Sequence, residues 1–162
     1  MNSPEFRKLS PMGRVPTIVD GEIILSESAA VCMYLADKFS YGVLAPKTED
    51  IKLRAEYTKW MIFSVGTLES FIARMFTHMN SPEEISETTR YVSGQCDIVK
   101  LALNPVLLKH DFILPSGFSA ADIMLAAVIP GAHDYLVKDN LPVQKYMERL
   151  MNREAAIRAK VF

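Results

Sequence analysis

The chain has 162 residues, of which 49% are hydrophobic and 23% charged, and its formal net charge is −1. That length and composition suffice for a buried core in a soluble globular protein of one domain or two small ones. The balanced charge gives no general attraction to nucleic acid or anionic membranes, so we expect neither as a partner. No apolar run approaches the roughly 20 residues that span a bilayer and no secretion signal is visible, so we expect a cytoplasmic protein.

Strand signals are confined to the N-terminal region. Two short β-branched runs, residues 15–19 and 22–25, are separated by Asp20-Gly21, which is a strong cue for a hairpin turn. From Ser28 to Phe39 the chain contains good helix formers and no helix breaker. The sequence therefore predicts an antiparallel hairpin followed by a helix.

The rest of the chain predicts helices and no further strand. Apolar residues recur at steps of three and four from about Ile51 to Met79, which indicates one long helix packed along its length. The run Ser81-Pro82-Glu83-Glu84 combines an N-cap, a proline at the first helical position and acids in the first turn. A second helix should begin there and run to about Asn104.

A third helix begins after Phe118. Ser119 is a suitable N-cap, Asp122 follows three residues later, and Phe118 and Ile123 could form a hydrophobic staple. Residues 123–129 are apolar on all sides, as expected for the central helix of a bundle, and Pro130 should end or kink this helix. Two short helices, at about 142–151 and 153–159, complete a mostly α fold.

The cysteines and histidines show no metal or redox pattern. Cys32 and Cys96 form no CxxC pair and lie in apolar helical surroundings, so we interpret both as small core residues, with a catalytic thiol or a disulfide as the alternative. His78, His110 and His133 have no ligand-like spacing to one another or to a cysteine. We therefore expect no metal site.

Two separate motifs resemble the cytosolic glutathione transferase family. The first is PMGRVPT at residues 11–17, followed by Asp20-Gly21 and by SESAA at residues 26–30, and it is similar to the second half of that family's glutathione-binding domain. The second is FSAAD at residues 118–122, which resembles the entry to the core helix of the family's all-helical domain. Residues 146–159 resemble its closing helices. The likeness covers nearly the whole chain and is greatest to bacterial members.

The resemblance implies two domains. Residues 1–41 would form a partial thioredoxin-like α/β region, consisting of a β-hairpin and a helix, and residues 42–162 would form the family's all-α C-terminal bundle. In the family, an initial strand–helix–strand unit precedes this hairpin and carries the Tyr, Ser or Cys that activates the thiol. Because residues 2–9 resemble the irregular helix that follows that unit, we expect the chain to lack the unit, which would leave the strand at 15–19 with an open apolar edge.

The resemblance also implies a glutathione site made by Val15, Pro16, Glu27 and Ser28. A cis proline at Pro16 would leave main-chain groups of Val15 free to pair with the cysteinyl part of the tripeptide. A helix start at Ser28 can receive the γ-glutamyl carboxylate, and Glu27 can receive the ammonium group. The residues alone also allow an edge strand begun by proline, a plain N-cap at Ser28 and a first-turn acid at Glu27. Arg14 could reach a second carboxylate or be a solvated turn residue.

A second substrate is implied as well. In the family, a small hydrophobic electrophile lies between the domains, and the candidate residues here are Trp60, Met61, Phe63 and Thr67 on the first long helix. The alternative is that these four residues belong to the core. Glutathione would be the co-substrate, no metal would take part, and the protein would form a homodimer.

The expected function is glutathione binding and, when the protein is complete, transfer of the glutathione thiolate to the electrophile. No residue matches the family's thiol-activating position, and Ser3, Ser10 and Tyr34 do not occupy the corresponding place, so we name no catalytic residue. The alternative is a non-catalytic module of the same fold that binds glutathione, dimerises or docks.

Overall fold

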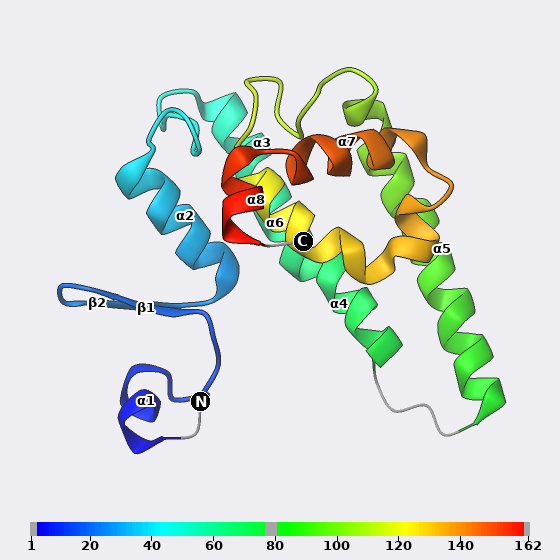
Figure 1. Ribbon diagram of the computed structural model, residues 1–162, viewed down its shortest axis with the longest axis horizontal. Coiled ribbons are helices and arrows are strands. Elements are labelled where there is room, and N and C mark those ends of the chain that lie inside the picture. The colour runs from blue at the N-terminus through cyan, green and yellow to red at the C-terminus, as the bar shows by residue number, and fades with distance from the viewer. Residues whose placement is uncertain (1–2, 77–80, 161–162) are drawn as a thin grey trace.

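The computed structural model describes residues 3–76 and 81–160. The chain begins with helix α1 (Pro4–Leu9), strands β1 (Thr17–Asp20) and β2 (Ile23–Ser26), and helix α2 (Ser28–Phe39). Helices alone follow in the described part of the chain (Figure 1): α3 (Ile51–Ile62), a π-helical segment (Phe63–Glu69), α4 (Ser70–Ile72), a 3₁₀ turn (Ala73–Phe76), α5 (Pro82–Leu107), α6 (Ala120–Val128), a 3₁₀ turn (Ile129–Ala132), a π-helical turn (His133–Val137), α7 (Leu141–Met151) and α8 (Glu154–Ala159). The predicted mostly α fold with one hairpin is confirmed.

The hairpin has the predicted pairing. Strands β1 and β2 are antiparallel, with Asp20 opposite Ile23, so Gly21 and Glu22 form the turn and Gly21 has a φ of 61°. Strand β1 begins at Thr17 and not at residue 15, because Pro16 has no N–H to donate to a ladder. The Tyr34 hydroxyl of α2 donates to the Asp20 carboxylate over 2.7 Å, and this bond ties the hairpin to the helix.

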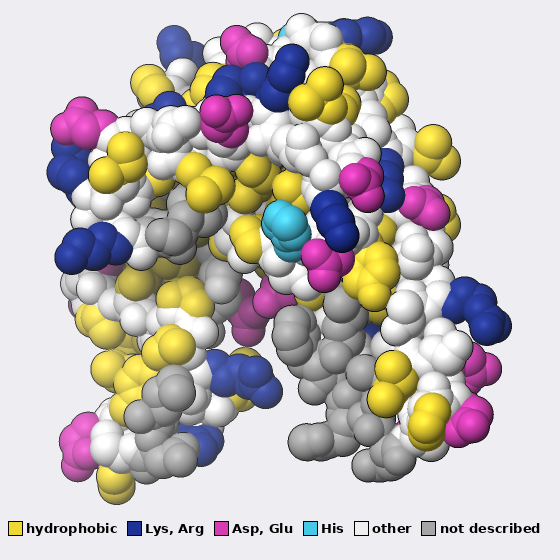
Figure 2. Space-filling view, turned by 45° about the vertical axis from the view of Figure 1, so that its right-hand side comes forward, with side chains coloured by type: hydrophobic (Ala, Val, Ile, Leu, Met, Phe, Trp, Pro, Cys, Tyr) yellow, Lys and Arg dark blue, Asp and Glu magenta, His cyan; other side chains and the backbone are white. Residues whose placement is uncertain are grey.

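The hairpin carries apolar side chains on its surface. In the described part of the chain β1 pairs with β2 alone. Val19 is 55% exposed and Ile24 50% exposed. Figure 2 shows hydrophobic side chains over the lower-left part of the molecule, which carries α1 and the hairpin in Figure 1. The hairpin therefore contributes little buried area of its own and depends on α2 for its place.

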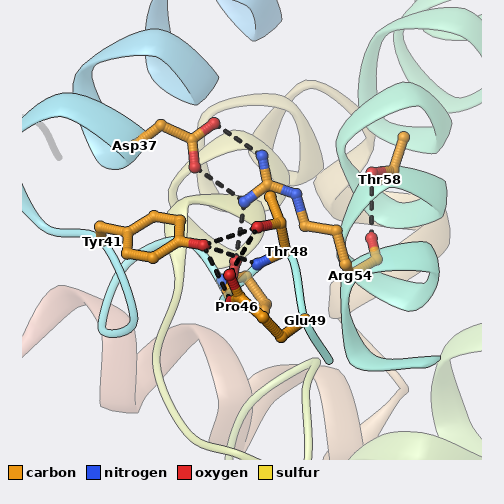
Figure 3. A network of polar contacts seen from close by, with 7 residues as sticks. All are labelled: Asp37, Tyr41, Pro46, Thr48, Glu49, Arg54 and Thr58. Carbon is orange, nitrogen blue, oxygen red and sulfur yellow. Dashed lines mark hydrogen bonds and ion pairs between the residues drawn. The ribbon is translucent and has the colours of Figure 1, made fainter. Parts of the chain in front are cut away.

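A polar network fixes the end of α2 to the start of α3 (Figure 3). The Arg54 guanidinium donates to both carboxylate oxygens of Asp37, over 2.7 and 2.6 Å, and to the carbonyl oxygen of Pro46 over 2.8 Å. In the same loop the Tyr41 hydroxyl accepts the N–H of Thr48 over 2.8 Å. A two-pronged ion pair of this kind fixes orientation as well as distance. It sets the geometry of α2 relative to α3.

The long apolar stripe is confirmed, but the helix that carries it is not uniform. Its buried residues include Tyr57, Trp60, Leu68 and Phe71. The backbone changes from α to π after Ile62 and reaches a 3₁₀ turn by residue 73, and Met79 lies outside the described residues. A period of three and four residues therefore located the buried face correctly and gave no sign of the wider π turn.

Helix α5 begins as predicted and ends later. The Ser81 hydroxyl accepts the N–H of Glu84 over 3.2 Å, with Pro82 at the first helical position. The helix continues past the predicted end at Asn104 to Leu107, with Pro105 inside it. A proline in the last turn removes a single hydrogen bond, so the helix can continue for these few residues.

Helix α6 is the centre of the helical region and packs against α2, α3 and α7. The Asp122 side chain is fully buried and accepts four hydrogen bonds: from the N–H groups of Ile113 and Ser119 over 2.8 Å each, from the Ser119 hydroxyl over 3.0 Å and from the Tyr146 hydroxyl over 2.9 Å. Burial raises the pKa of Asp122, and these hydrogen bonds oppose that rise. One carboxylate thus joins the start of α6 to a loop and to α7.

The predicted surroundings of α6 are correct in part. Met124 and Leu125 are buried, whereas Ile123 is 42% exposed, so one side of the helix is open to solvent. Phe118 lies edge-on to Phe112, with 5.6 Å between the ring centres. The helix ends at Val128, before the 3₁₀ turn that contains Pro130, as predicted.

The stretch Ala120–Val137 is the one candidate for a membrane span among the described residues, by length and composition only. Half of it is buried inside the helical region, and it contains α, 3₁₀ and π geometry. These are the properties of a core helix.

We predict that Asp122→Ala lowers the free energy of unfolding by about 3 kcal/mol or more, because four buried donors lose their acceptor and each unsatisfied donor costs about 1–3 kcal/mol. Urea denaturation followed by circular dichroism measures this change. The matched control is Asp97→Ala, which removes an exposed carboxylate paired with Lys100 and should cost less than about 1 kcal/mol. Equal losses in the two variants would contradict the central role of Asp122.

Candidate functional site

A cavity of about 490 Å³ lies where the hairpin region meets the π-helical segment. All four residues of the predicted glutathione site, Val15, Pro16, Glu27 and Ser28, line it. Its other lining residues come from the loop before β1 (Ser10, Met12, Arg14), from the β2–α2 junction (Ser26, Ala29, Ala30) and from the opposite wall (Ile62, Val65, Glu69). The space-filling view shows the molecule hollowed between the part with α1 and the hairpin and the helical region (Figure 2).

Hydrogen bonds hold the loop before β1 in place. The buried Ser10 hydroxyl donates to the Arg14 carbonyl oxygen over 3.0 Å and accepts the Arg14 N–H over 3.1 Å. The Thr17 hydroxyl donates to the same carbonyl oxygen over 2.9 Å. The Val15–Pro16 bond is cis, as the resemblance implied, and Val15 is 64% exposed at the cavity. The main chain of Val15 is thus presented on a fixed loop.

The opening of α2 lacks a side-chain cap. Glu27 is its N-cap, with φ 74° and ψ 119°, and makes no capping hydrogen bond, while Ser28 is the first helical residue. The plain N-cap interpretation of Ser28 is therefore wrong. The first backbone bond of α2 joins the N–H of Val31 to the Glu27 carbonyl oxygen over 2.9 Å. The earlier N–H groups find no acceptor in the described part of the chain, and a helix start in this condition attracts anions.

The backbone of Glu27 is strained. A positive φ is uncommon for a residue with a Cβ, and sparsely populated backbone conformations of this kind cluster at functional sites. In this conformation Glu27 and Ser28 both line the cavity.

Three charged side chains line the cavity: Arg14, Glu27 and Glu69. All three residues are exposed, and among residues 3–76 and 81–160 none of these side chains has a hydrogen bond or an ion pair. Charges of both signs therefore remain available to a ligand that itself carries both signs.

The second-substrate candidates are not brought together in this cavity. Trp60 is 3% exposed and Met61 fully buried, so the alternative interpretation as core residues holds for both. Phe63 is half-buried with its ring edge-on to Trp60, and Thr67 is exposed. The cavity wall is made by Ile62, Val65 and Glu69, on a different face of the same helix.

Sequence reasoning missed this wall because it followed the most apolar face. Consecutive residues of a helix differ by about 100° in direction, so Ile62 points away from the direction of Met61. Ile62 is apolar and yet 55% exposed. This exposure beside the buried stripe marks the cavity wall, but it is visible in the structure and not in the sequence.

The three hydroxyls that we set aside are engaged elsewhere. The Ser3 hydroxyl caps α1 by accepting the Phe6 N–H over 3.2 Å. Ser10 is bonded to the backbone of Arg14, and Tyr34 donates to Asp20. Of the three, Ser10 lines the cavity, and its hydroxyl is already bonded to the Arg14 backbone.

The cysteines are core residues and not activated thiols. Burial raises the pKa of Cys96 to about 11 and also raises the pKa of the half-buried Cys32. No three His, Cys, Asp or Glu side chains gather as metal ligands within the described ranges, from which His78 is missing.

Two sequence comparisons point to the same family. Residues 1–46 match the family model described as "Glutathione S-transferase, N-terminal domain". The chain is 31% identical to Glutathione S-transferase 2 of Anopheles gambiae, over 80% of this chain and 61% of that protein. It is 29% identical to Glutathione S-transferase Z1 of Arabidopsis thaliana, over 79% of this chain and 58% of the relative. The chain thus spans about three fifths of these relatives.

Solved structures share the fold. A glutathione S-transferase from Xylella fastidiosa superposes with a TM-score of 0.82 at 21% identity, covering 98% of this chain and 81% of that one. Ure2p5 from Phanerochaete chrysosporium gives a TM-score of 0.77 at 22% identity, covering 96% and 77%. With the two motifs and the shared fold, the sequence matches support one conclusion: the chain is a glutathione S-transferase-like protein.

Proposed function

We propose that the cavity binds glutathione and that the protein transfers the glutathione thiolate to a small hydrophobic electrophile. The observation that carries this proposal is the meeting of Val15, Pro16, Glu27 and Ser28 in one cavity. Its volume of about 490 Å³ lies within the usual range for small-molecule sites.

The chemistry of the lining residues matches the tripeptide group by group. The free N–H groups at the start of α2 and the Ser28 hydroxyl would receive the γ-glutamyl carboxylate, and Glu27 would receive the neighbouring ammonium. The exposed main chain of Val15 would pair with the cysteinyl part, and Arg14 would receive the glycyl carboxylate. Each charge of glutathione then has an opposite partner.

Transfer requires a thiolate. A cysteine thiol has a reference pKa of about 8.5 and is mostly protonated at neutral pH, so a positioned donor must stabilise the anion. We assign no described residue to that task. Ure2p5 was cocrystallized with 1-(S-glutathionyl)-2,4-dinitrobenzene, and this supports an aromatic electrophile as a candidate class for the protein.

Several further features belong to the same proposal. The domain boundary would lie between residues 41 and 42, and Ile62 and Val65 would join Phe63 and Thr67 beside the electrophile. The likeness to glutathione transferases supports glutathione as the co-substrate. We further propose a cytoplasmic homodimer of the bacterial subgroup. In this proposal the reaction uses no metal, and the protein binds neither nucleic acid nor a membrane. No specific observation favours the non-catalytic module over a transferase.

We predict that Ser28→Ala and Glu27→Ala each weaken glutathione binding by about 1–3 kcal/mol, since each loses hydrogen bonds to a charged group. Isothermal titration calorimetry of the chain with glutathione measures this. Matched controls are Ser116→Ala and Glu22→Ala, which alter exposed residues outside the cavity and should bind like the unchanged chain. Full affinity in both cavity variants would refute the proposed site.

We predict that Glu27→Gly stabilises the fold by about 1 kcal/mol while it weakens glutathione binding. Glycine relieves a backbone strain of about 1–3 kcal/mol and adds about 0.5–1 kcal/mol of unfolded-state entropy. Thermal and urea denaturation give the stability. The control is Glu22→Gly, whose φ is not positive, and this variant should be neutral or slightly destabilised. A loss of stability in Glu27→Gly would show that the strain does not depend on the side chain.

A further inference from the structure

Glu69 is the charged residue of the wall that faces the hairpin. It is the last residue of the π-helical segment Phe63–Glu69 and lines the cavity with Ile62 and Val65. Glu27 and Ser28 line the same cavity from the β2–α2 junction. The Glu69 side chain has no ion pair or hydrogen bond within the described ranges.

The orientation of this wall is fixed by the other face of the segment. Ser64 and Leu68 are fully buried, and the Ser64 hydroxyl donates to the Met61 carbonyl oxygen over 2.7 Å. Ile62, Val65 and Glu69 all line the cavity, so they lie on one face, and this face stays turned to the cavity while Ser64 and Leu68 are buried. The packing therefore keeps Glu69 on the cavity side of the segment.

Glutathione leaves Glu69 without a partner. In the proposed binding mode Arg14 and the start of α2 receive the two carboxylates of the tripeptide, and Glu27 receives its one ammonium. The lining residues supply two carboxylates, Glu27 and Glu69, against that single ammonium. One carboxylate remains, and it lies beside the apolar side chains of Ile62 and Val65.

From this arrangement we infer that Glu69 is a specificity-determining residue that selects electrophiles with an apolar body and a positively charged group. The inference rests on the proposed function and deepens it by naming the class of the second substrate. Ile62 and Val65 contact the apolar body, and the Glu69 carboxylate attracts a cationic group and repels an anionic one. Because Glu69 is exposed, water and salt weaken this charge interaction, and its effect on affinity is modest.

The test uses S-alkylglutathiones of one chain length that end in an ammonium, a methyl or a carboxylate group. Their dissociation constants for the chain are measured by isothermal titration calorimetry at low ionic strength. We expect the ammonium-ended ligand to bind more tightly than the carboxylate-ended one by about threefold or more, the range of exposed charge pairs. In Glu69→Gln this ratio should fall towards one, and in Glu69→Lys it should reverse.

The matched control is Glu83→Gln, which removes one negative charge from an exposed position on α5 outside the cavity and should keep the ratio. The inference is overturned if the ratio of the two dissociation constants is unchanged in Glu69→Gln, or if it falls equally in the control. In either case, binding of the methyl-ended ligand still supports the glutathione site. Failure of all three ligands to bind the unchanged chain overturns the proposed function and the inference with it.

Discussion

The start of α6 is the junction on which the rest of the structure depends. The buried Asp122 carboxylate collects donors from a loop, from the helix start and from α7. Next to it, the Ala120 N–H donates to the Leu44 carbonyl oxygen over 2.9 Å, which ties in the loop that follows α2. A fully satisfied buried polar network of this kind specifies one arrangement of the elements that meet there.

The cavity follows from that junction. Helices α2 and α3 both pack on α6, and the Asp37–Arg54 pair sets the end of α2 against the start of α3. From this point the chain reaches the cavity along both helices, backwards to Glu27 and Ser28 and forwards to the π-helical segment (Figure 1). The Asp37–Arg54 pair and Asp122, which hold α2 and α3 in place, do not themselves line the cavity. The strained Glu27 backbone can persist because packing elsewhere supplies the stability.

Sequence reasoning located what depends on local chemistry. The turn at Gly21, the cap at Ser81 and the acid at Asp122 each act within a few residues, so their patterns predicted the hairpin and two helix starts. The candidate glutathione residues were found through a family motif, and the structure places all four at one cavity. Wider context decided the rest. The π turn after Ile62 has no marker in the apolar period. Trp60 and Met61 were named as candidates beside the electrophile, with the core as the alternative, and the structure buries both in the core.

The central claim is that glutathione lies between the Val15 loop and the start of α2. Amide chemical-shift mapping tests it most directly, because it reports the binding place and not only affinity. On titration with glutathione, the account predicts the largest shifts at the amides of Val15, Glu27, Ser28 and Ala29. Shifts confined to the apolar groove between α6 and α7, around Ala127 and Met147, would contradict it.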